Sequence, residues 1–150
     1  MKILMAADHG AYQLKNRLKK HLTANKHIIV DLGVNDETSV DYPDIAVRAA
    51  AEFKKNSYDF GIVMCGTGIG ISMAANKIKG IRCALLHGIF DARMAKAHNN
   101  ANFIALGGRI KYHSPAEEIV DTFIKSSFDK ENARHAQRIN KITALEGQNG

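Results

Sequence analysis

The stretch Phe60-Gly-Ile-Val-Met-Cys-Gly-Thr-Gly-Ile-Gly70 joins a short apolar run to three glycines at alternate positions. An apolar run rich in Ile, Val and Met is typical of a buried strand in a parallel sheet. The glycines let the backbone turn tightly and approach a bound group closely. Residues 71–77, which follow, are expected to form a helix whose free N–H groups face the turn. This strand, turn and helix predict an α/β protein.

Other apolar runs alternate with helical patterns along the rest of the chain. The expected strands cover residues 2–7, 27–31, 60–64, 81–86 and 103–106, and the expected helices cover residues 11–24, 44–55, 71–77, 89–98, 115–127 and 132–146. Ser114 is expected to cap the helix that starts at Pro115, with Glu117 three residues after the cap.

Strands that alternate with helices predict a parallel sheet with right-handed crossovers and helices on both faces. We therefore expect a three-layer αβα sandwich with a five-stranded, doubly wound sheet of Rossmann-like or flavodoxin-like order. Residues 1–150 are expected to form a single domain, with residues 146–150 as a frayed tail.

The composition favours a protein that is neither secreted nor bound to a membrane. Cys65 and Cys83 lie in apolar runs and form neither a disulfide framework nor a metal-binding spacing. The apolar run at residues 3–7 is too short for a signal peptide, and no run approaches the roughly 18 apolar residues of a membrane span. The net charge of +6 leaves room for an anionic partner, but no nucleic-acid-binding motif is present. We expect a cytoplasmic protein that binds no membrane, nucleic acid or metal.

Chemically capable residues follow three of the predicted strands. Asp8 and His9 follow the first strand, Cys65 and its glycines follow the third, and Gly107-Gly108-Arg109 follows the fifth. Ligands of doubly wound sheets bind at the carboxyl ends of the strands. These residues therefore predict an active site at that edge of the sheet.

The glycine loop lacks the signatures of three common phosphate-binding loops. Ile71 stands where a dinucleotide-binding G-x-G-x-x-G would need glycine and where a cysteine phosphatase would need arginine. No Gly-Lys-Ser/Thr closes the loop, which excludes a P-loop. Two interpretations remain: a set of backbone N–H groups with a thiol beside it, or a tight turn that follows a core cysteine.

Cys65 suits proton transfer if the loop is a site. The N-terminus of a helix favours the thiolate form of a cysteine, and a base is most effective near neutral pH. Removing a proton next to a sugar carbonyl creates an enediolate, whose oxyanion needs fixed donors. The N–H groups of residues 66–70 and the Thr67 hydroxyl can supply them.

For three further residues the sequence allows two interpretations, a role in the site or a structural role at the surface. His98 is expected at a helix end, where a histidine either caps the helix dipole or takes part in catalysis. Arg134 and Arg138 are four residues apart, so they share a helix face. They either grip one phosphate together or lie on the surface.

The chain resembles the type B ribose-5-phosphate isomerases, of the ribose/galactose-6-phosphate isomerase family, over nearly its whole length. The most specific part of the resemblance is the block Cys65-Gly-Thr-Gly-Ile-Gly-Ile-Ser-Met-Ala-Ala-Asn-Lys77. The other matching segments are Asp8-His9-Gly10, Leu14-Lys15, Asp41-Tyr42-Pro43-Asp44, Gly80-Ile-Arg-Cys-Ala84, His98-Asn99, Ala105-Leu-Gly-Gly-Arg109 and Arg134-His135-Ala-Gln-Arg138.

This resemblance implies reversible conversion of D-ribose 5-phosphate to D-ribulose 5-phosphate through a cis-enediol, without metal or cofactor, in the non-oxidative pentose phosphate pathway. It implies that Cys65 moves a proton between C2 and C1, assisted by Thr67. It assigns opening of the sugar ring to His98, together with Asp8. The enediolate would be held by the amides of Gly66, Thr67, Gly68, Ile69 and Gly70.

The resemblance also implies how the rest of the substrate is bound. Asn99 would contact the sugar, and the phosphate would be bound by His9, Arg109, Arg134 and Arg138. Members of the family are homodimers, often paired into tetramers, with each site built from two subunits. The C-terminal helix is therefore expected to extend to a partner subunit.

Two positions bear on the place of the chain within the family. One branch lacks the cysteine and uses a glutamate shortly after the glycine loop. Ile71 stands at that position and Cys65 is present, which indicates the cysteine branch. Asn100 stands where relatives commonly carry aspartate, and this change leaves the Cys65 and His98 pair intact.

Two other functions remain as alternatives. The first is the same chemistry on a six-carbon sugar phosphate, such as galactose 6-phosphate or allose 6-phosphate. The second is a non-catalytic module that binds a sugar phosphate or a nucleotide. The joint presence of Cys65, Thr67 and His98 argues against the second alternative.

Overall fold

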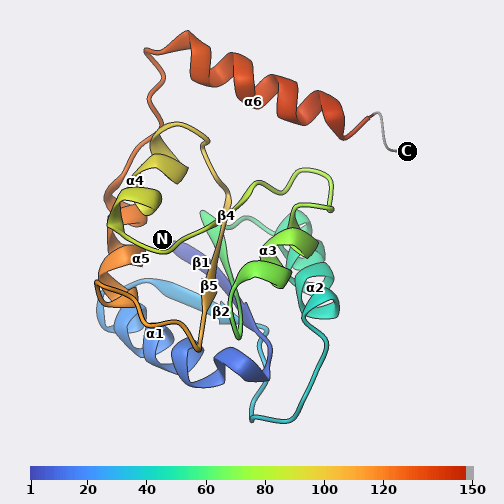
Figure 1. Ribbon diagram of the computed structural model, residues 1–150, viewed down its shortest axis with the longest axis vertical. Coiled ribbons are helices and arrows are strands. Elements are labelled where there is room, and N and C mark those ends of the chain that lie inside the picture. The colour runs from blue at the N-terminus through green and yellow to red at the C-terminus, as the bar shows by residue number, and fades with distance from the viewer. Residues whose placement is uncertain (148–150) are drawn as a thin grey trace.

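A parallel sheet of five strands in the order β2-β1-β3-β5-β4 forms the centre of the computed structural model, which describes residues 1–147 (Figure 1). The strands are β1 (Lys2–Ala7), β2 (Ile28–Asp31), β3 (Phe60–Cys65), β4 (Cys83–Leu85) and β5 (Phe103–Gly107). A 3-10 turn, η1 (His9–Ala11), precedes the helices α1 (Tyr12–Ala24), α2 (Tyr42–Lys55), α3 (Ile69–Ala75), α4 (Ile89–Ala97), α5 (Ala116–Lys125) and α6 (Ala133–Leu145). The predicted α/β class and the parallel, doubly wound sheet are confirmed.

The last two strands are exchanged relative to the flavodoxin-like order, in which β4 would lie beside β3. This exchange determines which face α4 covers, because a right-handed crossover places its helix on a face set by the direction of the step. The steps from β1 to β2 and from β4 to β5 run in one direction, and those from β2 to β3 and from β3 to β4 run in the other. Accordingly α1, α4 and α5 cover one face, and α2 and α3 cover the other (Figure 1).

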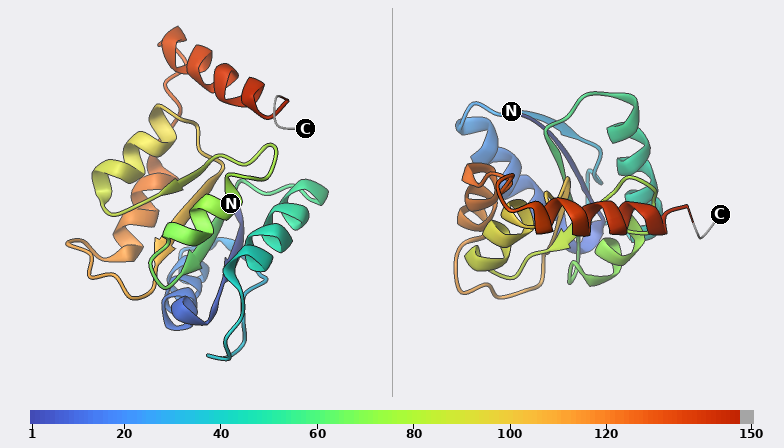
Figure 2. Two further views of the ribbon diagram at one scale, coloured as in Figure 1. Left: turned by 45° about the vertical axis from the view of Figure 1, so that its right-hand side comes forward. Right: turned by 90° about the horizontal axis from the view of Figure 1, so that it is seen from above.

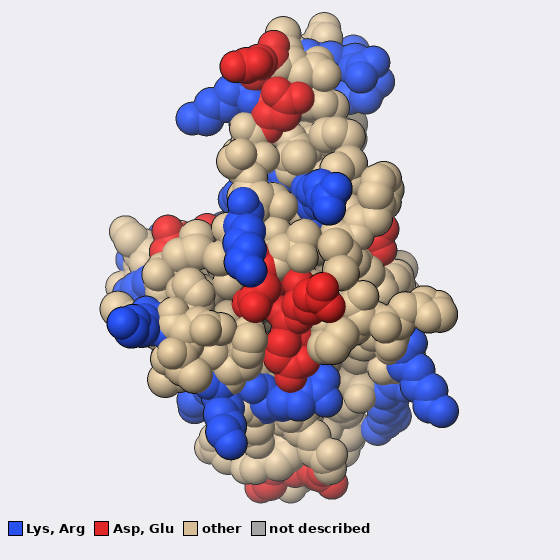
Figure 3. All heavy atoms as spheres, turned by 90° about the vertical axis from the view of Figure 1, so that its left-hand side faces the viewer, with Lys and Arg blue, Asp and Glu red and all other residues tan. Residues whose placement is uncertain are grey.

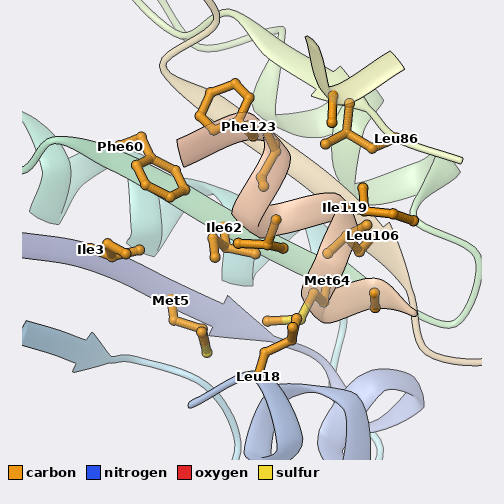
Figure 4. Packing of buried hydrophobic residues seen from close by; sticks show 14 of the residues in the cluster. Ile3, Met5, Leu18, Phe60, Ile62, Met64, Leu86, Leu106, Ile119 and Phe123 are labelled. Carbon is orange, nitrogen blue, oxygen red and sulfur yellow. The ribbon is translucent and has the colours of Figure 1, made fainter. Parts of the chain in front are cut away.

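Two apolar layers hold the helices to the sheet. Successive β1 side chains alternate between them, with Ile3 and Met5 in the layer under α1, α4 and α5 and Leu4 in the layer under α2 and α3. Figure 4 shows the first layer, in which the rings of Phe60 and Phe123 lie 5.0 Å apart between centroids. Each fully buried side chain of this size contributes roughly 1.5–3 kcal/mol to stability. The Cys65 side chain belongs to the second layer.

Some predicted element ends differ from the structure. The prediction that Ser114 caps α5 is wrong: Pro115 occupies the N-cap position, and its carbonyl oxygen accepts the N–H groups of Glu118 and Ile119. No side chain among residues 1–147 caps this helix. β4 begins at Cys83 rather than at residue 81. The reason is that the Arg82 N–H donates to the Asn102 side chain instead of joining the strand ladder.

The C-terminal helix α6 lies outside the three layers, across one end of the molecule (Figures 1 and 2). Glu146 caps its C-terminus, and Oε1 of that side chain accepts the Gly80 N–H at 2.8 Å. The predicted tail, residues 146–150, falls partly on residues 148–150, outside the described residues.

Candidate active site

The loops that follow β1, β3 and β5 come together at the carboxyl edge of the sheet. The N–H of Gly108 donates to the carbonyl of Cys65, and the N–H of Arg109 donates to the carbonyl of Gly66, both at 2.9 Å. A Cβ atom on Gly10 would lie 2.9 Å from the Gly66 nitrogen, and a Cβ on Gly108 would lie 2.4 Å from the Gly10 oxygen. Glycine at both positions therefore allows the three loops to pack backbone to backbone.

Cys65 ends β3 with its side chain buried, 4% exposed, at this meeting point. Its Sγ accepts the Gly68 N–H at 3.2 Å, and an N–H aimed at sulfur stabilises negative charge there. Gly68 has a φ of 79°, and a Cβ at this position would lie 2.9 Å from the Leu106 carbonyl carbon. Glycine at position 68 thus permits the turn that directs the N–H at the thiol.

The predicted amide donors of the glycine loop divide into two groups. The Gly68 N–H is taken by Cys65, and the Ile69 N–H by the Thr67 hydroxyl at 3.3 Å. Within the described residues, the N–H groups of Gly66, Thr67 and Gly70 donate to no partner. These three amides and the exposed Thr67 side chain are the groups free to bind an oxyanion.

Asp8 and Arg109 flank the glycine loop. The Asp8 side chain is buried, and Oδ1 accepts the Gly10 N–H at 2.8 Å. Burial raises the pKa of Asp8, against the opposing effects of the Gly10 N–H and of positive charge at His9 and Arg109. The Arg109 side chain lies against Gly66, where an added Cβ would be 3.5 Å from its Cδ.

His9 and Arg109 line a cavity of about 330 Å³ beside these loops. The Val40 N–H donates to Nδ1 of His9 at 3.2 Å, so the neutral imidazole carries its proton on Nε2. The loop between β2 and α2 supplies this donor and also Glu37, whose Oε1 accepts the Gln13 Nε2 at 3.0 Å. A proton donor and a guanidinium thus share one polar cavity, which suits an anionic group.

Tyr112 is a further neighbour of Cys65 at the end of β5. Its hydroxyl oxygen accepts the Gly107 N–H at 2.7 Å. Burial raises the pKa of Tyr112, and negative charge at Cys65 adds to the rise while the Gly107 N–H opposes it. No sequence motif marks this tyrosine, because only the turn after β5 brings it back to the end of that strand.

The other predicted site residues lie at the opposite edge of the sheet. His98 caps the C-terminus of α4, and its ring stacks on His135 of α6 with centroids 4.2 Å apart and an angle of 15° between planes. Asn99 follows His98, and the exposed Arg134 and Arg138 flank His135 on α6. His135 is buried, and this lowers its pKa, as does positive charge at His98.

The structure therefore places the predicted residues in two groups. The carboxyl-edge group consists of Asp8, His9, Cys65, Arg109 and the amides of residues 66–70, and the amino-edge group consists of His98, Asn99, Arg134 and Arg138. Cys65 pairs with Gly107 at the end of β5, whereas His98 precedes the start of that strand. Five strand residues span about 13 Å, so one chain does not bring its two groups to one small molecule.

A larger cavity, of about 1010 Å³, lies between α6 and the segment of residues 76–84. Asn99 lines it, and none of the carboxyl-edge group does. Over residues 1–147, no three or more His, Cys, Asp and Glu side chains are grouped so that they could hold a metal ion. In the same part of the chain, no helix has the length and apolar character needed to cross a membrane.

Figure 3 shows the face formed by α1, α4 and α5, with α6 above it. Acidic side chains gather near the middle of this face, and basic side chains surround them. The excess positive charge of the chain is therefore not concentrated there into one basic surface.

Comparison with known proteins finds isomerases that act on sugars and sugar phosphates. A family model described as Ribose/Galactose Isomerase matches residues 3–142. The chain is 37% identical, over 144 residues, to a galactose-6-phosphate isomerase subunit of Clostridium acetobutylicum, covering 95% of this chain and 83% of that one.

Two solved structures are closely similar over almost the full length. Ribose-5-phosphate isomerase B of Clostridium thermocellum superposes with a TM-score of 0.94 at 43% identity, covering 100% of both chains. Ribose-5-phosphate isomerase B of Mycoplasma genitalium, solved with bound ribulose 5-phosphate, has a TM-score of 0.89 at 41% identity, covering 97% of this chain and 96% of that one.

Proposed function

This chain belongs to the ribose/galactose isomerase family, and on that premise we propose that it interconverts D-ribose 5-phosphate and D-ribulose 5-phosphate through a cis-enediolate. The observation that best supports the proposal is the environment of the Cys65 thiol. Its thiol is buried, receives the Gly68 N–H, and lies in the loop that also presents the free amides of Gly66, Thr67 and Gly70.

In the proposed reaction Cys65, as thiolate, removes the proton from C2 of the open-chain aldose and returns it to C1. Negative charge develops on the C1 oxygen as the C2 hydrogen leaves, and the free amides of the glycine loop stabilise that charge. Thr67 exchanges a proton with the oxygens of the enediolate. The carbonyl moves from C1 to C2 with no net gain or loss of electrons, so the step needs no redox cofactor.

Ring opening, sugar contact and phosphate binding are assigned to residues of the carboxyl-edge and amino-edge groups. His98 opens the furanose ring together with Asp8, because the closed sugar has no carbonyl to acidify its C2 proton. Asn99 contacts the sugar, and the phosphate is bound by His9, Arg109, Arg134 and Arg138. The buried Asp8 carboxyl has a raised pKa, which suits a group that passes a proton.

These roles require a second copy of the chain, since His98 and Cys65 lie at opposite edges of one sheet. We propose a homodimer in which α6 of one subunit extends to the carboxyl edge of its partner. Each site then combines the carboxyl-edge group of one subunit with the amino-edge group of the other. We place the enzyme in the cytoplasm and in the non-oxidative pentose phosphate pathway, and its two free cysteines fit a reducing compartment.

A six-carbon sugar phosphate is the second candidate substrate. The 37% identity with a galactose-6-phosphate isomerase subunit favours it specifically. The chemistry at Cys65 would be unchanged, and only the room for one more carbon between the reacting atoms and the phosphate would differ.

The test is to compare kcat/KM of the purified protein for ribose 5-phosphate, galactose 6-phosphate and allose 6-phosphate, with EDTA present throughout. We expect ribose 5-phosphate to give the highest value and EDTA to leave it unchanged. A preference of about tenfold or more for a hexose phosphate, equivalent to about 1.4 kcal/mol in transition-state binding, would contradict the pentose assignment. Loss of activity with EDTA would contradict the metal-free mechanism.

A further inference from the structure

Arg82 has no role in the mechanism described above, although it lies in the Gly80-Ile-Arg-Cys-Ala84 segment. We propose that Arg82 is a positioning residue that holds the turn carrying His98 and Asn99, and through it the ring-opening step. The proposal rests on the proposed function for its catalytic consequence. Its structural part, the placement of the His98 ring, can be tested without substrate.

The contacts of Arg82 converge on one turn. Its Nη2 donates to the carbonyl oxygen of Asn100 at 2.8 Å, and its Nε lies 3.4 Å from that of Asn99. The backbone N–H of Arg82 donates to Oδ1 of Asn102 at 2.8 Å. One residue therefore binds three residues, Asn99, Asn100 and Asn102, of the segment that links α4 to β5.

The turn that Arg82 binds follows the end of α4 and has an unusual backbone conformation. Asn100 has a φ of 41°, in the left-handed region that asparagine tolerates better than most residues. The carbonyl groups of Asn99 and Asn100 lie beyond the end of α4, and the planar guanidinium of Arg82 can bind both of them at once. A lysine at position 82 would supply a single ammonium group without that fork.

The segment between α4 and β5 is connected to both ends of α6, at one end through Gly80 and at the other through His98. Asn102 Nδ2 donates to the Gly80 carbonyl, and the Gly80 N–H donates to Glu146 at the end of α6, both at 2.8 Å. At the other end of α6, His135 stacks on His98. The ring-opening histidine and the helix that carries Arg134 and Arg138 are therefore braced against each other through residues 80–82.

The experiment compares Arg82→Gln and Arg82→Lys with the wild type, with Arg17→Gln as the matched control. Arg17 also has a bonded guanidinium, paired with Glu117 at 2.6 Å, but it lies on an exposed face of α1. In D₂O with ribulose 5-phosphate, exchange of a C1 hydrogen needs only proton transfer by Cys65. Conversion of ring-closed ribose 5-phosphate to ribulose 5-phosphate begins with ring opening, so it also needs the groups that His98 and Asn99 supply. Both rates are followed by NMR, each from its own substrate.

For Arg82→Gln we expect conversion to fall roughly 10- to 100-fold, the range for a misplacement of about 1 Å, while exchange falls much less. Arg82→Lys recovers part of the conversion, and Arg17→Gln matches the wild type. A crystal structure of Arg82→Gln shows the His98 ring displaced from its stack on His135 by about 1 Å or more.

Unchanged conversion, or a proportional loss of conversion and exchange, would overturn the positioning role, since a general structural defect slows both reactions. If the wild type isomerises no ribose 5-phosphate, the proposed function fails. The crystal structure then still decides the proposal for Arg82, and an undisturbed stack of His98 on His135 would overturn it.

Discussion

Cys65 and Cys83 are both buried, yet their surroundings differ in the way that reactivity requires. Cys65 receives an N–H from Gly68, whereas burial raises the pKa of Cys83 on β4 to about 12. Burial keeps the second thiol protonated at neutral pH, whereas the sulfur of the first has a hydrogen-bond donor aimed at it. The chain thus contains its own control for any test of thiol chemistry.

Cys65→Ala is expected to lower kcat by about 10²- to 10⁴-fold, the contribution of a general base, while ribose 5-phosphate still binds. Steady-state kinetics and calorimetric titration measure the two effects separately. Cys83→Ala keeps kcat within about twofold of the wild type and loses only core packing, on the order of 1 kcal/mol of stability. Near-normal turnover in Cys65→Ala would remove this cysteine from the mechanism.

Asp8→Asn separates the stability of the site from its activity. Because burial raises the pKa of Asp8 in the folded protein, its stabilising contribution is complete below the unfolded value of 3.8 and is lost as pH rises through the folded pKa. Asparagine keeps an acceptor for the Gly10 N–H but carries no charge. We therefore expect Asp8→Asn to unfold at higher urea concentration than the wild type at neutral pH, with roughly 10²-fold lower kcat.

The measurement is urea unfolding of both proteins from neutral pH down to the lowest pH at which both fold. The advantage of Asp8→Asn in free energy of unfolding shrinks as pH falls. An advantage that stays constant with pH, or a variant that is less stable at neutral pH, would contradict the raised pKa of Asp8.

At the scale of elements, periodicity in the sequence predicted the strands and most helices, because alternating and 3.6-residue patterns are local. The exchange of β4 and β5 was not predicted, since no local pattern records which strand lies beside β3. The start of α5 was misjudged because Pro115 suits both the N-cap position seen here and the first helical position. Which strands lie side by side, and how a helix end is capped, depend on contacts between residues that are distant in the sequence.

The loop between β2 and α2 depends on one buried ion pair. Lys15 Nζ, on α1, donates to Asp31 and to the Val34 carbonyl, both at 2.9 Å, and its side chain is 3% exposed. Burial would raise the pKa of Asp31, but hydrogen bonds from Lys15, Gly33 and Lys19 together hold it below its usual value. This clamp anchors the loop whose Val40 N–H orients His9.

Lys15→Met is expected to lower the free energy of unfolding at pH 7 by about 3 kcal/mol, because it leaves the Asp31 carboxylate without its buried partner. Lys19 also binds this carboxylate, but its side chain is 47% exposed. We therefore expect Lys19→Met to lower the free energy of unfolding by about 1 kcal/mol or less. Since the folded pKa of Asp31 is depressed, the effect of Lys15→Met is present above pH 3.8 and fades as pH falls further. Equal losses for both variants in urea unfolding would contradict a buried clamp.

On the scale of the whole molecule, the sequence predicted one group of site residues better than the other. Asp8, His9 and Arg109 follow strand ends and Cys65 is the last residue of β3, so the rule for parallel sheets places them at one edge. His98, Arg134 and Arg138 lie at the other edge, and local patterns left them between a site and a surface role. Only the family resemblance assigned them to the site, because their proposed partners belong to another copy of the chain.

A site shared between two subunits makes a quantitative prediction for mixed dimers. Cys65→Ala disables the carboxyl-edge group of a subunit, and His98→Gln disables its amino-edge group, so each variant alone is expected to be inactive. In a mixed dimer, one site combines the intact Cys65 of one chain with the intact His98 of the other. Random exchange makes half of the dimers mixed, each with one intact site, so about a quarter of wild-type activity returns.

The two purified variants are mixed under mild denaturation, refolded and assayed, with native mass spectrometry to count the mixed dimers. The matched control mixes Cys65→Ala with Arg109→Ala. Both of these lesions lie in the carboxyl-edge group, so each site of their mixed dimer keeps one lesion and no activity returns. Absence of recovery in the first mixture, despite abundant mixed dimers, would mean that Cys65 and His98 do not meet across subunits. The separation of the two groups within one chain would then need another explanation, such as a role for His98 outside catalysis.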